Sequence, residues 1–164
     1  PAVSAQSDLR HAAALLANVL SDHGGSRLYW SLIDPGLADS VMLQFDSGND
    51  HAGVFMGYAS TEPANADQVR DLFISELQGI QDNLPTEAEW QAARNKVATS
   101  VMLGAETPFV RLMGLGNSWL YRGEYTPVDT TVSRILNSPL TDAERLLSER
   151  PFDSSLMLEL GPER

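Results

Sequence analysis

The stretch VMLQFDSGNDHAGVFMGY, residues 41–58, decides the fold of this chain. Apolar residues alternate with other residues on both sides of a central turn, and they are Val41, Leu43 and Phe45 before it and Val54, Met56 and Tyr58 after it. The intervening residues 47–50 read Ser-Gly-Asn-Asp, a run of turn formers. Alternation with a period of two predicts β-strands, so we expect an antiparallel hairpin of 41–45 with 54–58. One face of each strand carries the larger apolar groups, so we expect helices to cover the hairpin.

Helical patterns flank this hairpin. Before it, apolar residues at helical spacing predict a helix over residues 8–21, and a short second helix is expected over Ser26–Leu32. After it, a helix is expected over residues 63–81. The sequence Thr86-Glu87-Ala88-Glu89 then has the pattern of a capping box, with a helix behind it whose Trp90, Val97 and Val101 face inward.

The last third of the chain continues with helix starts. Thr107-Pro108 and Thr126-Pro127 each look like an N-cap followed by proline at the first helical position, and residues 141–144 form a second capping-box pattern. Gly114 and Gly116 fall inside the helix after Pro108, where close packing against a neighbour would compensate for their cost. We expect the aromatic residues at helical spacing to lie in the core, and these are Tyr29, Trp30, Trp90, Trp119 and Tyr121.

The chain ends with an alternating segment, Ser154–Leu160, in which Leu156, Leu158 and Leu160 share one face. It predicts a terminal strand. Strands separated from helical runs indicate an α+β domain, a mostly antiparallel sheet covered on one side by several helices. Because three strands make a thin sheet, we expect a further first strand to lie before Pro1. Residues 1–164 are then a single domain, and the missing Met start suggests a fragment of a longer chain.

Composition excludes several classes of function. Acidic residues outnumber basic ones 22 to 11, giving a net charge of −11, so nucleic acid and membrane surfaces are disfavoured as partners. The scattered acids favour a solvated surface over a chamber wall that attracts cationic peptides. No apolar run approaches the length of a membrane helix, so no membrane insertion is expected. Zero cysteines exclude disulfides and thiolate sites.

A search for catalytic residues gives none, and it gives no metal site. His11, His23 and His51 do not stand in H-x-x-E-H or H-x-x-x-H. Asp8 and His11 can share a helix face, which favours a surface pair or an N-terminal helix contact over a metal site. Asp22-His23 sits at a helix end, where a favourable interaction of the histidine with the helix dipole is a better interpretation than catalysis.

Two further motifs fail on their context. Residues 116–120 begin like a G-x-S-x-G elbow but lack the second glycine and lie in a helix. Residues 23–27 lack the lysine of a phosphate loop, so a helix stop and restart is the better interpretation.

Several motifs together resemble a known family. A-L-L-A-N-V-L (14–20), G-G-S-R-L-Y (24–29) and G-L-A-D-S (36–40) resemble the helix–G-G-S-R-L-F–G-L-A-Y-S stretch of the pitrilysin/insulinase-type zinc peptidases, which include the relatives of the mitochondrial processing peptidase. Further matches follow in the same order, and they are 53–59 with G-x-F-x-x-Y-A, 86–96 with T-E-E-E-L-x-x-A-K-N-x, 114–125 with a run ending in Y-G-R-Y, and 160–162 with the closing L-G-P. Each motif is weak alone, but together they are specific.

The resemblance implies a fold and a role. In that family two similar α+β halves face each other as a clamshell. The first half carries H-x-x-E-H and a later Glu, which bind zinc and activate water, and the second half closes over the peptide. This chain lacks H-x-x-E-H, so it resembles the second, non-catalytic half. Zinc is then expected in the missing N-terminal half and none in this chain.

One departure from the family concerns substrate binding. Active members often supply an Arg and, seven residues on, a Tyr from this half to hold the substrate. Here the stretch from Ser26 to Ser40 is one residue shorter, so the Arg position falls on Leu32 or Ile33 and the Tyr position holds Asp39. An ionised Asp39 has no hydrogen to donate to an oxyanion, so neither role carries over.

The resemblance therefore predicts the zinc-free C-terminal domain of a bacterial-type zinc metalloendopeptidase, which shapes the chamber and binds unfolded peptide by strand addition to a sheet edge. The expected partners are the N-terminal catalytic half, or a partner subunit of the same family, and the peptide substrate. The alternative is a structural or assembly subunit that kept this fold without catalysis. A stand-alone α+β binding domain is the third possibility.

Overall fold

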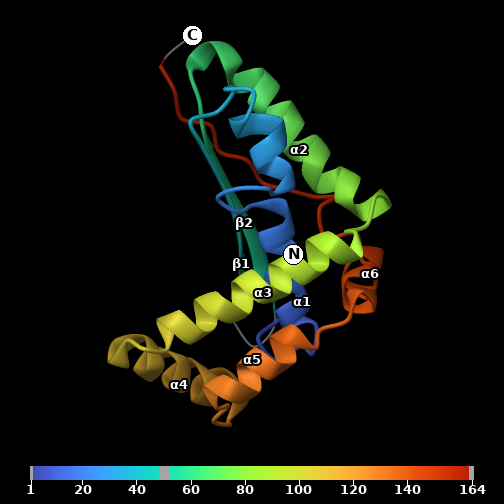
Figure 1. Ribbon diagram of the computed structural model, residues 1–164. Coiled ribbons are helices and arrows are strands. Elements are labelled where there is room, and N and C mark those ends of the chain that lie inside the picture. Colours follow the sequence, from blue (N-terminus) through green and yellow to red (C-terminus); the bar gives the residue numbers. More distant parts are fainter. Residues whose placement is uncertain (1, 49–51, 163–164) are drawn as a thin grey trace.

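The computed structural model describes residues 2–48 and 52–162. Its elements are α1 (Arg10–Leu20), the π-helix η1 (Tyr29–Ile33), β1 (Ser40–Asp46), β2 (Val54–Ser60), the 3-10 helix η2 (Pro63–Asn65), α2 (Ala66–Asp82), α3 (Glu87–Gly104), α4 (Pro108–Arg122), α5 (Val128–Leu136) and α6 (Leu140–Ser148). The predicted α+β class is confirmed, with β1 and β2 forming an antiparallel sheet whose inner face joins the helical core (Figure 1). Asn49 and Asp50 of the predicted turn, and His51, lie outside the described residues.

The pairing of β1 with β2 fixes which side chains face the helices. Leu43, only 5% exposed, lies opposite Gly57, and Phe45 lies opposite Phe55. Phe73 of α2 packs directly against Gly57, since a Cβ added at Gly57 would lie 2.6 Å from the Cζ atom of Phe73. A glycine at this position therefore lets α2 approach the sheet.

The prediction that helices cover Val54, Met56 and Tyr58 is wrong. These side chains are 43%, 41% and 56% exposed, on the face of β2 that points away from α2. The register is the reason, because it places Phe55, Gly57 and Ala59 on the same face as Leu43. The smaller residues of β2 face the helices, and the larger ones form the open face.

The predicted helix over residues 8–21 is the central element of the core. Its Leu15, Leu16 and Leu20 are completely buried, and α1 contacts α3, α6 and β1. The chain then turns at Gly25, whose φ of +89° suits glycine. The short predicted helix 26–32 is present, and its residues from Tyr29 onward form η1.

The first predicted capping box is confirmed at the start of α3. The Thr86 hydroxyl accepts the Glu89 amide, and the Glu89 carboxylate accepts the Thr86 amide. Trp90 is completely buried, and its indole N–H donates to the carbonyl of Ser138 at 3.0 Å. This contact ties α3 to the segment between α5 and α6.

The later helix starts differ in detail from the prediction. α4 begins at Pro108 as predicted, although Thr107 makes no side-chain cap bond. Pro127 is the residue before α5 rather than its first residue. The second capping box is wrong, because α6 already begins at Leu140, so Thr141 lies inside the helix.

Two packing predictions around α4 are also wrong within the described chain. Apart from the adjacent residues and the nearby backbone of α4 itself, no described atom lies within 4 Å of the position that a Cβ on Gly114 or Gly116 would take. Trp119 is 65% exposed, and Trp30 of η1 is 59% exposed, so neither lies in the core. The reason is that no described element covers these parts of the surface.

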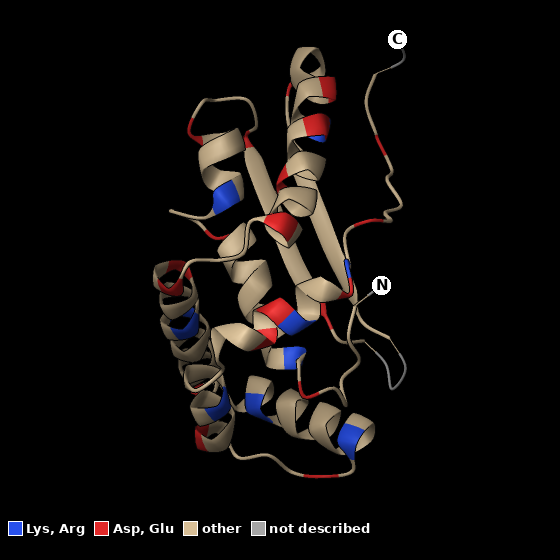
Figure 2. Cartoon of the chain, turned by 90° about the vertical axis from the view of Figure 1, so that its right-hand side faces the viewer, with Lys and Arg blue, Asp and Glu red and all other residues tan. Residues whose placement is uncertain are grey.

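The predicted terminal strand is not formed among the described residues. Residues 154–160 carry no strand pairing, and Leu156, Leu158 and Leu160 are at least 82% exposed. In Figures 1 and 2 this segment runs past the sheet without joining it. An alternating sequence forms a strand only when it lies beside another strand with which it can pair. No strand among the described residues lies beside this segment and pairs with it.

Candidate functional site

The open face of the hairpin is the candidate functional surface. Its side chains come from two paired strands, because Met42 lies opposite Tyr58 and Gln44 lies opposite Met56. Met42, Met56 and Tyr58 are between 41% and 56% exposed. Two flexible thioethers beside an aromatic ring form an apolar surface that adapts to varied side chains. This surface lies on the side of the sheet away from α2.

The outer edge of β2 is also open. At its beginning, the amide of Ala2 donates to the carbonyl of Gly53 at 2.8 Å, and the amide of Gly53 donates back at 3.0 Å. Backbone groups alternate between the two edges of a strand, so those of Phe55, Gly57 and Ala59 point to the same side as those of Gly53. This edge can accept an antiparallel strand in the register that the Ala2–Gly53 bridge begins.

The residues at the family's Arg position, Leu32 or Ile33, and at its Tyr position, Asp39, lie in different surroundings. Leu32 is completely buried in the core, and Ile33 is half-buried against it. Asp39 is exposed just before β1, and its amide donates to the carbonyl of Ser60 at 2.8 Å. Leu32 therefore contacts only protein, whereas Asp39 lies at one end of the hairpin.

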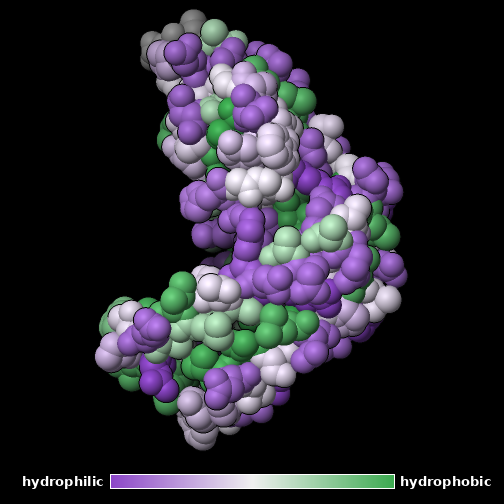
Figure 3. Space-filling view, viewed as in Figure 1, coloured by the Kyte–Doolittle hydropathy of each residue, from purple (hydrophilic) through white to green (hydrophobic). Residues whose placement is uncertain are grey.

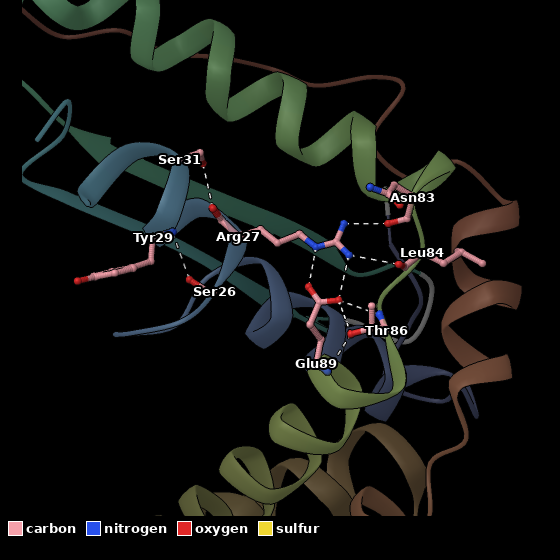
Figure 4. A network of polar contacts seen from close by, with 8 residues as sticks. All are labelled: Ser26, Arg27, Tyr29, Ser31, Asn83, Leu84, Thr86 and Glu89. Atoms are coloured by element: carbon pink, nitrogen blue, oxygen red, sulfur yellow. Dashed lines mark hydrogen bonds and ion pairs between the residues drawn. The ribbon is translucent and has the colours of Figure 1, made fainter. Parts of the chain in front are cut away.

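A network around Arg27 holds η1 against the turn between α2 and α3 (Figure 4). The Arg27 guanidinium donates to both carboxylate oxygens of Glu89, at 2.9 and 3.2 Å, and to the carbonyls of Asn83 and Leu84. The hydrogen bonds from Arg27 are the largest cause that lowers the pKa of Glu89 to about 2, and those from Thr86 add to them. Because these protein groups occupy the guanidinium, residues 23–27 do not form a phosphate site. Arg27 lies in the motif 24–29 and Glu89 in the capping box 86–89, but neither motif predicted an ion pair between the two residues.

The acids next to the histidines make ion pairs with other residues, and His11 is partly buried in the protein. Asp8 forms an ion pair with Arg145 at 3.5 Å rather than with His11, so the predicted Asp8–His11 pair is wrong. His11 is half-buried, its Nε2 lacks a partner among the described residues, and burial with nearby arginines lowers its pKa to about 4. Asp22 accepts a hydrogen bond from Lys96.

No group of three or more His, Cys, Asp or Glu residues that could hold a metal ion occurs in ranges 2–48 and 52–162. Acidic residues are spread over many elements (Figure 2). The hydroxyl of Ser118, in the rejected elbow motif, is held inside the protein, donating to the carbonyl of Glu124 and accepting from Arg122. The described residues therefore offer an apolar face and a strand edge rather than a catalytic group.

Comparison with known proteins identifies the family. The model of the family described as "Peptidase M16 inactive domain" matches residues 1–97, which is more than half of the chain. The chain belongs to this family. This M16 inactive domain is 28% identical, over 156 residues, to an uncharacterized zinc protease of Streptomyces coelicolor. The match covers 92% of this domain and 34% of that relative, so the chain spans about a third of its length.

Solved structures share the fold of this M16 inactive domain. The inactive peptidase domain of a Bordetella parapertussis protein named as a zinc protease aligns with a TM-score of 0.75 at 20% identity, over 89% of this chain and 79% of that one. A chain of complex III from Candida albicans aligns with a TM-score of 0.80 at 14% identity, over 90% of this chain and 37% of that one. The resemblance drawn from the sequence motifs is thus confirmed. None of the helices in the described part is both long and apolar enough to span a bilayer.

Proposed function

We propose that this M16 inactive domain is the non-catalytic half of a clamshell zinc metalloendopeptidase, in which it shapes the chamber and binds unfolded peptide. The observation that carries the proposal is the open face of Met42, Met56 and Tyr58, an apolar surface on the side of the sheet that the helices leave uncovered. Peptide bonds are hydrolysed in the other half, where zinc is bound. This domain contributes binding rather than chemistry.

Residues 1–164 are, in this proposal, the C-terminal inactive domain of a longer parent protein. The Ala2–Gly53 bridge supports a strand preceding Pro1, because an antiparallel chain continuing upstream from Ala2 runs along β2. That strand would also lie between β2 and the segment of Leu156 and Leu158, giving this segment a neighbour to pair with. With the edge of β2 taken by that strand, the outer edge of β1, which pairs with no second strand among the described residues, remains for strand addition by the substrate.

The experiment on the parent protein combines zinc analysis with cleavage of an unfolded fluorogenic peptide. The Met56→Asp/Tyr58→Asp variant should raise KM about tenfold and leave kcat nearly unchanged, because the lost contacts bind substrate without touching the zinc. Leu84→Asp is the matched control, since Leu84 is 39% exposed and lies at the turn before α3. A KM that stays unchanged in the double variant would refute binding at the open face.

The second candidate is an assembly subunit without catalysis. It is favoured by the TM-score of 0.80 to a chain of complex III, and by the replacement of the family's Arg and Tyr by Leu32 or Ile33 and by Asp39. A parent protein that holds no zinc and cleaves no peptide, but purifies as a stable complex with other subunits, would support this candidate and refute the peptidase.

A further inference from the structure

α4 projects from the body of the chain with almost its whole surface uncovered. Of its fifteen residues, all of them described, only Ser118 is buried. Phe109, Leu112, Trp119 and Leu120 are between 64% and 71% exposed. The last turn of α3 continues this surface with Met102 and Leu103. We call α4 together with residues 102 and 103 the apolar arm, and Figure 3 shows hydrophobic surface gathered at this end of the molecule.

The apolar arm is unusual for a surface that stays in water. Soluble proteins rarely leave a large contiguous apolar patch exposed unless it binds something. Gly114 and Gly116 each make the helix less stable than alanine at the same position would. Apart from the adjacent residues and the nearby backbone of α4 itself, the described chain places nothing within 4 Å of their missing Cβ positions, so their bare backbone is open to close approach from outside. A packed partner would offset both costs.

The charges on α4 indicate the chemistry of that partner. α4 carries no acidic residue, although the whole chain has a net charge of −11. Of its two arginines, Arg122 is held within the chain by Ser118 and by Glu124 at 3.9 Å, whereas Arg111 is exposed. A second copy of the chain fits poorly, because two bodies with a net charge of −11 each would repel. A different surface, with an apolar centre and carboxylates around it, matches the apolar arm in both respects.

Building on the proposed function, we propose that the apolar arm is the surface on which the catalytic half of the parent zinc protease docks. The Streptomyces relative is about three times as long as the region that this chain matches, so a protein of that length has room for such a half. Docking would bury α4 and the end of α3, and it would leave the open face of the hairpin free for peptide.

The methionines of the chain provide the test. Met102 and Met113 lie in the apolar arm, Met42 and Met56 lie on the open face, and all four are between 41% and 51% exposed in this chain. Hydrogen peroxide oxidises exposed methionine to the sulfoxide, which mass spectrometry measures at each residue. The oxidation rate of each methionine in the intact parent protein is divided by the oxidation rate of the same methionine in the protein unfolded in urea, which corrects for differences in intrinsic reactivity.

With docking, Met102 and Met113 oxidise at least about fivefold more slowly than Met42 and Met56 when no peptide is present. Equal rates at the four residues overturn the proposal, and so does a protection that disappears on dilution, which would indicate a second copy. Addition of an unfolded peptide should then slow the oxidation of Met42 and Met56. That second result tests the proposed function separately, because the rates of Met102 and Met113 do not depend on it.

A pair of variants checks that the apolar arm itself makes the contact. Leu112→Asp/Leu120→Asp should raise the oxidation rate of Met113 to that of Met56, because two buried carboxylates weaken docking. Leu84→Asp, outside the apolar arm, should leave Met113 protected. Unchanged protection of Met113 in the double variant would refute docking through this surface.

Discussion

Arg27 and Glu89 stand 62 residues apart in the sequence and form a two-point ion pair, with the Arg27 Nε atom 2.9 Å from one carboxylate oxygen of Glu89 and an Nη atom 3.2 Å from the other. Glu89 also completes the capping box of α3 through Thr86. A single carboxylate therefore starts a helix and joins it to the segment before η1.

Loss of the Glu89 charge should destabilise the fold in a pH-dependent way. The folded-state pKa of Glu89 is about 2, below its ordinary value of 4.5. Its contribution is therefore present above pH 4.5 and is lost as the pH falls from 4.5 toward 2. Glu89→Gln should lower the free energy of unfolding by about 1–2 kcal/mol at pH 7 and by much less near pH 2. Urea denaturation across this range measures both, and the exposed Glu144→Gln is the control.

His11 should destabilise the fold in mildly acidic solution. Its folded-state pKa is about 4, lower than its ordinary value of 6.5, because of burial first and then the charges of Arg10, Arg134 and Arg122. The unfolded chain takes up the proton first, so stability should fall by about 2–3 kcal/mol between pH 7 and pH 4.

Thermal unfolding of wild-type chain and His11→Gln over this range checks the effect, and the variant should lose this part of the pH dependence. His23→Gln, at an exposed histidine, should behave as wild type. An identical pH dependence in His11→Gln and wild type would show that His11 is not responsible.

Gly57→Ala should weaken the contact between the sheet and α2. The new Cβ would lie 2.6 Å from the Phe73 ring, so the ring must move, at a cost of about 1–3 kcal/mol in the free energy of unfolding. The smaller side chain in Phe73→Leu should recover part of this loss in the double variant, which denaturant titrations of the two single variants and the double variant would show. Gly79→Ala, where nothing lies within 4 Å of the added Cβ, is the control.

Trp90→Phe should cost about 1–2 kcal/mol, because the buried indole N–H donates to the carbonyl of Ser138. The carbonyl keeps its bond from Arg94 at 3.2 Å, which limits the loss. In the chain by itself, Trp119→Phe should change stability by less than about 0.5 kcal/mol, since Trp119 is 65% exposed. Chemical denaturation followed by circular dichroism measures the free energy of unfolding of both variants. Equal losses of stability in Trp90→Phe and Trp119→Phe would contradict the burial of Trp90 and the exposure of Trp119.

Local patterns predicted much of this fold. The alternation around residues 41–58 gave the hairpin, the apolar spacing gave α1 and α2, and the Thr86 capping box gave the start of α3. Each of these signals depends on residues close together in the chain. The candidate site was harder to predict, because Met56 and Tyr58 were recognised as a strand face but assigned to the wrong side of the sheet.

The sequence by itself determined the α+β class, the order of the elements and the family, because these follow from local periodicity and from motifs that occur in a fixed order. The tertiary structure alone decided that Phe73 packs on Gly57 and turns Tyr58 outward, that Arg27 meets Glu89, and that α4 lies uncovered. These outcomes depend on which surfaces meet across long separations in the chain, and short-range patterns hold no information about that.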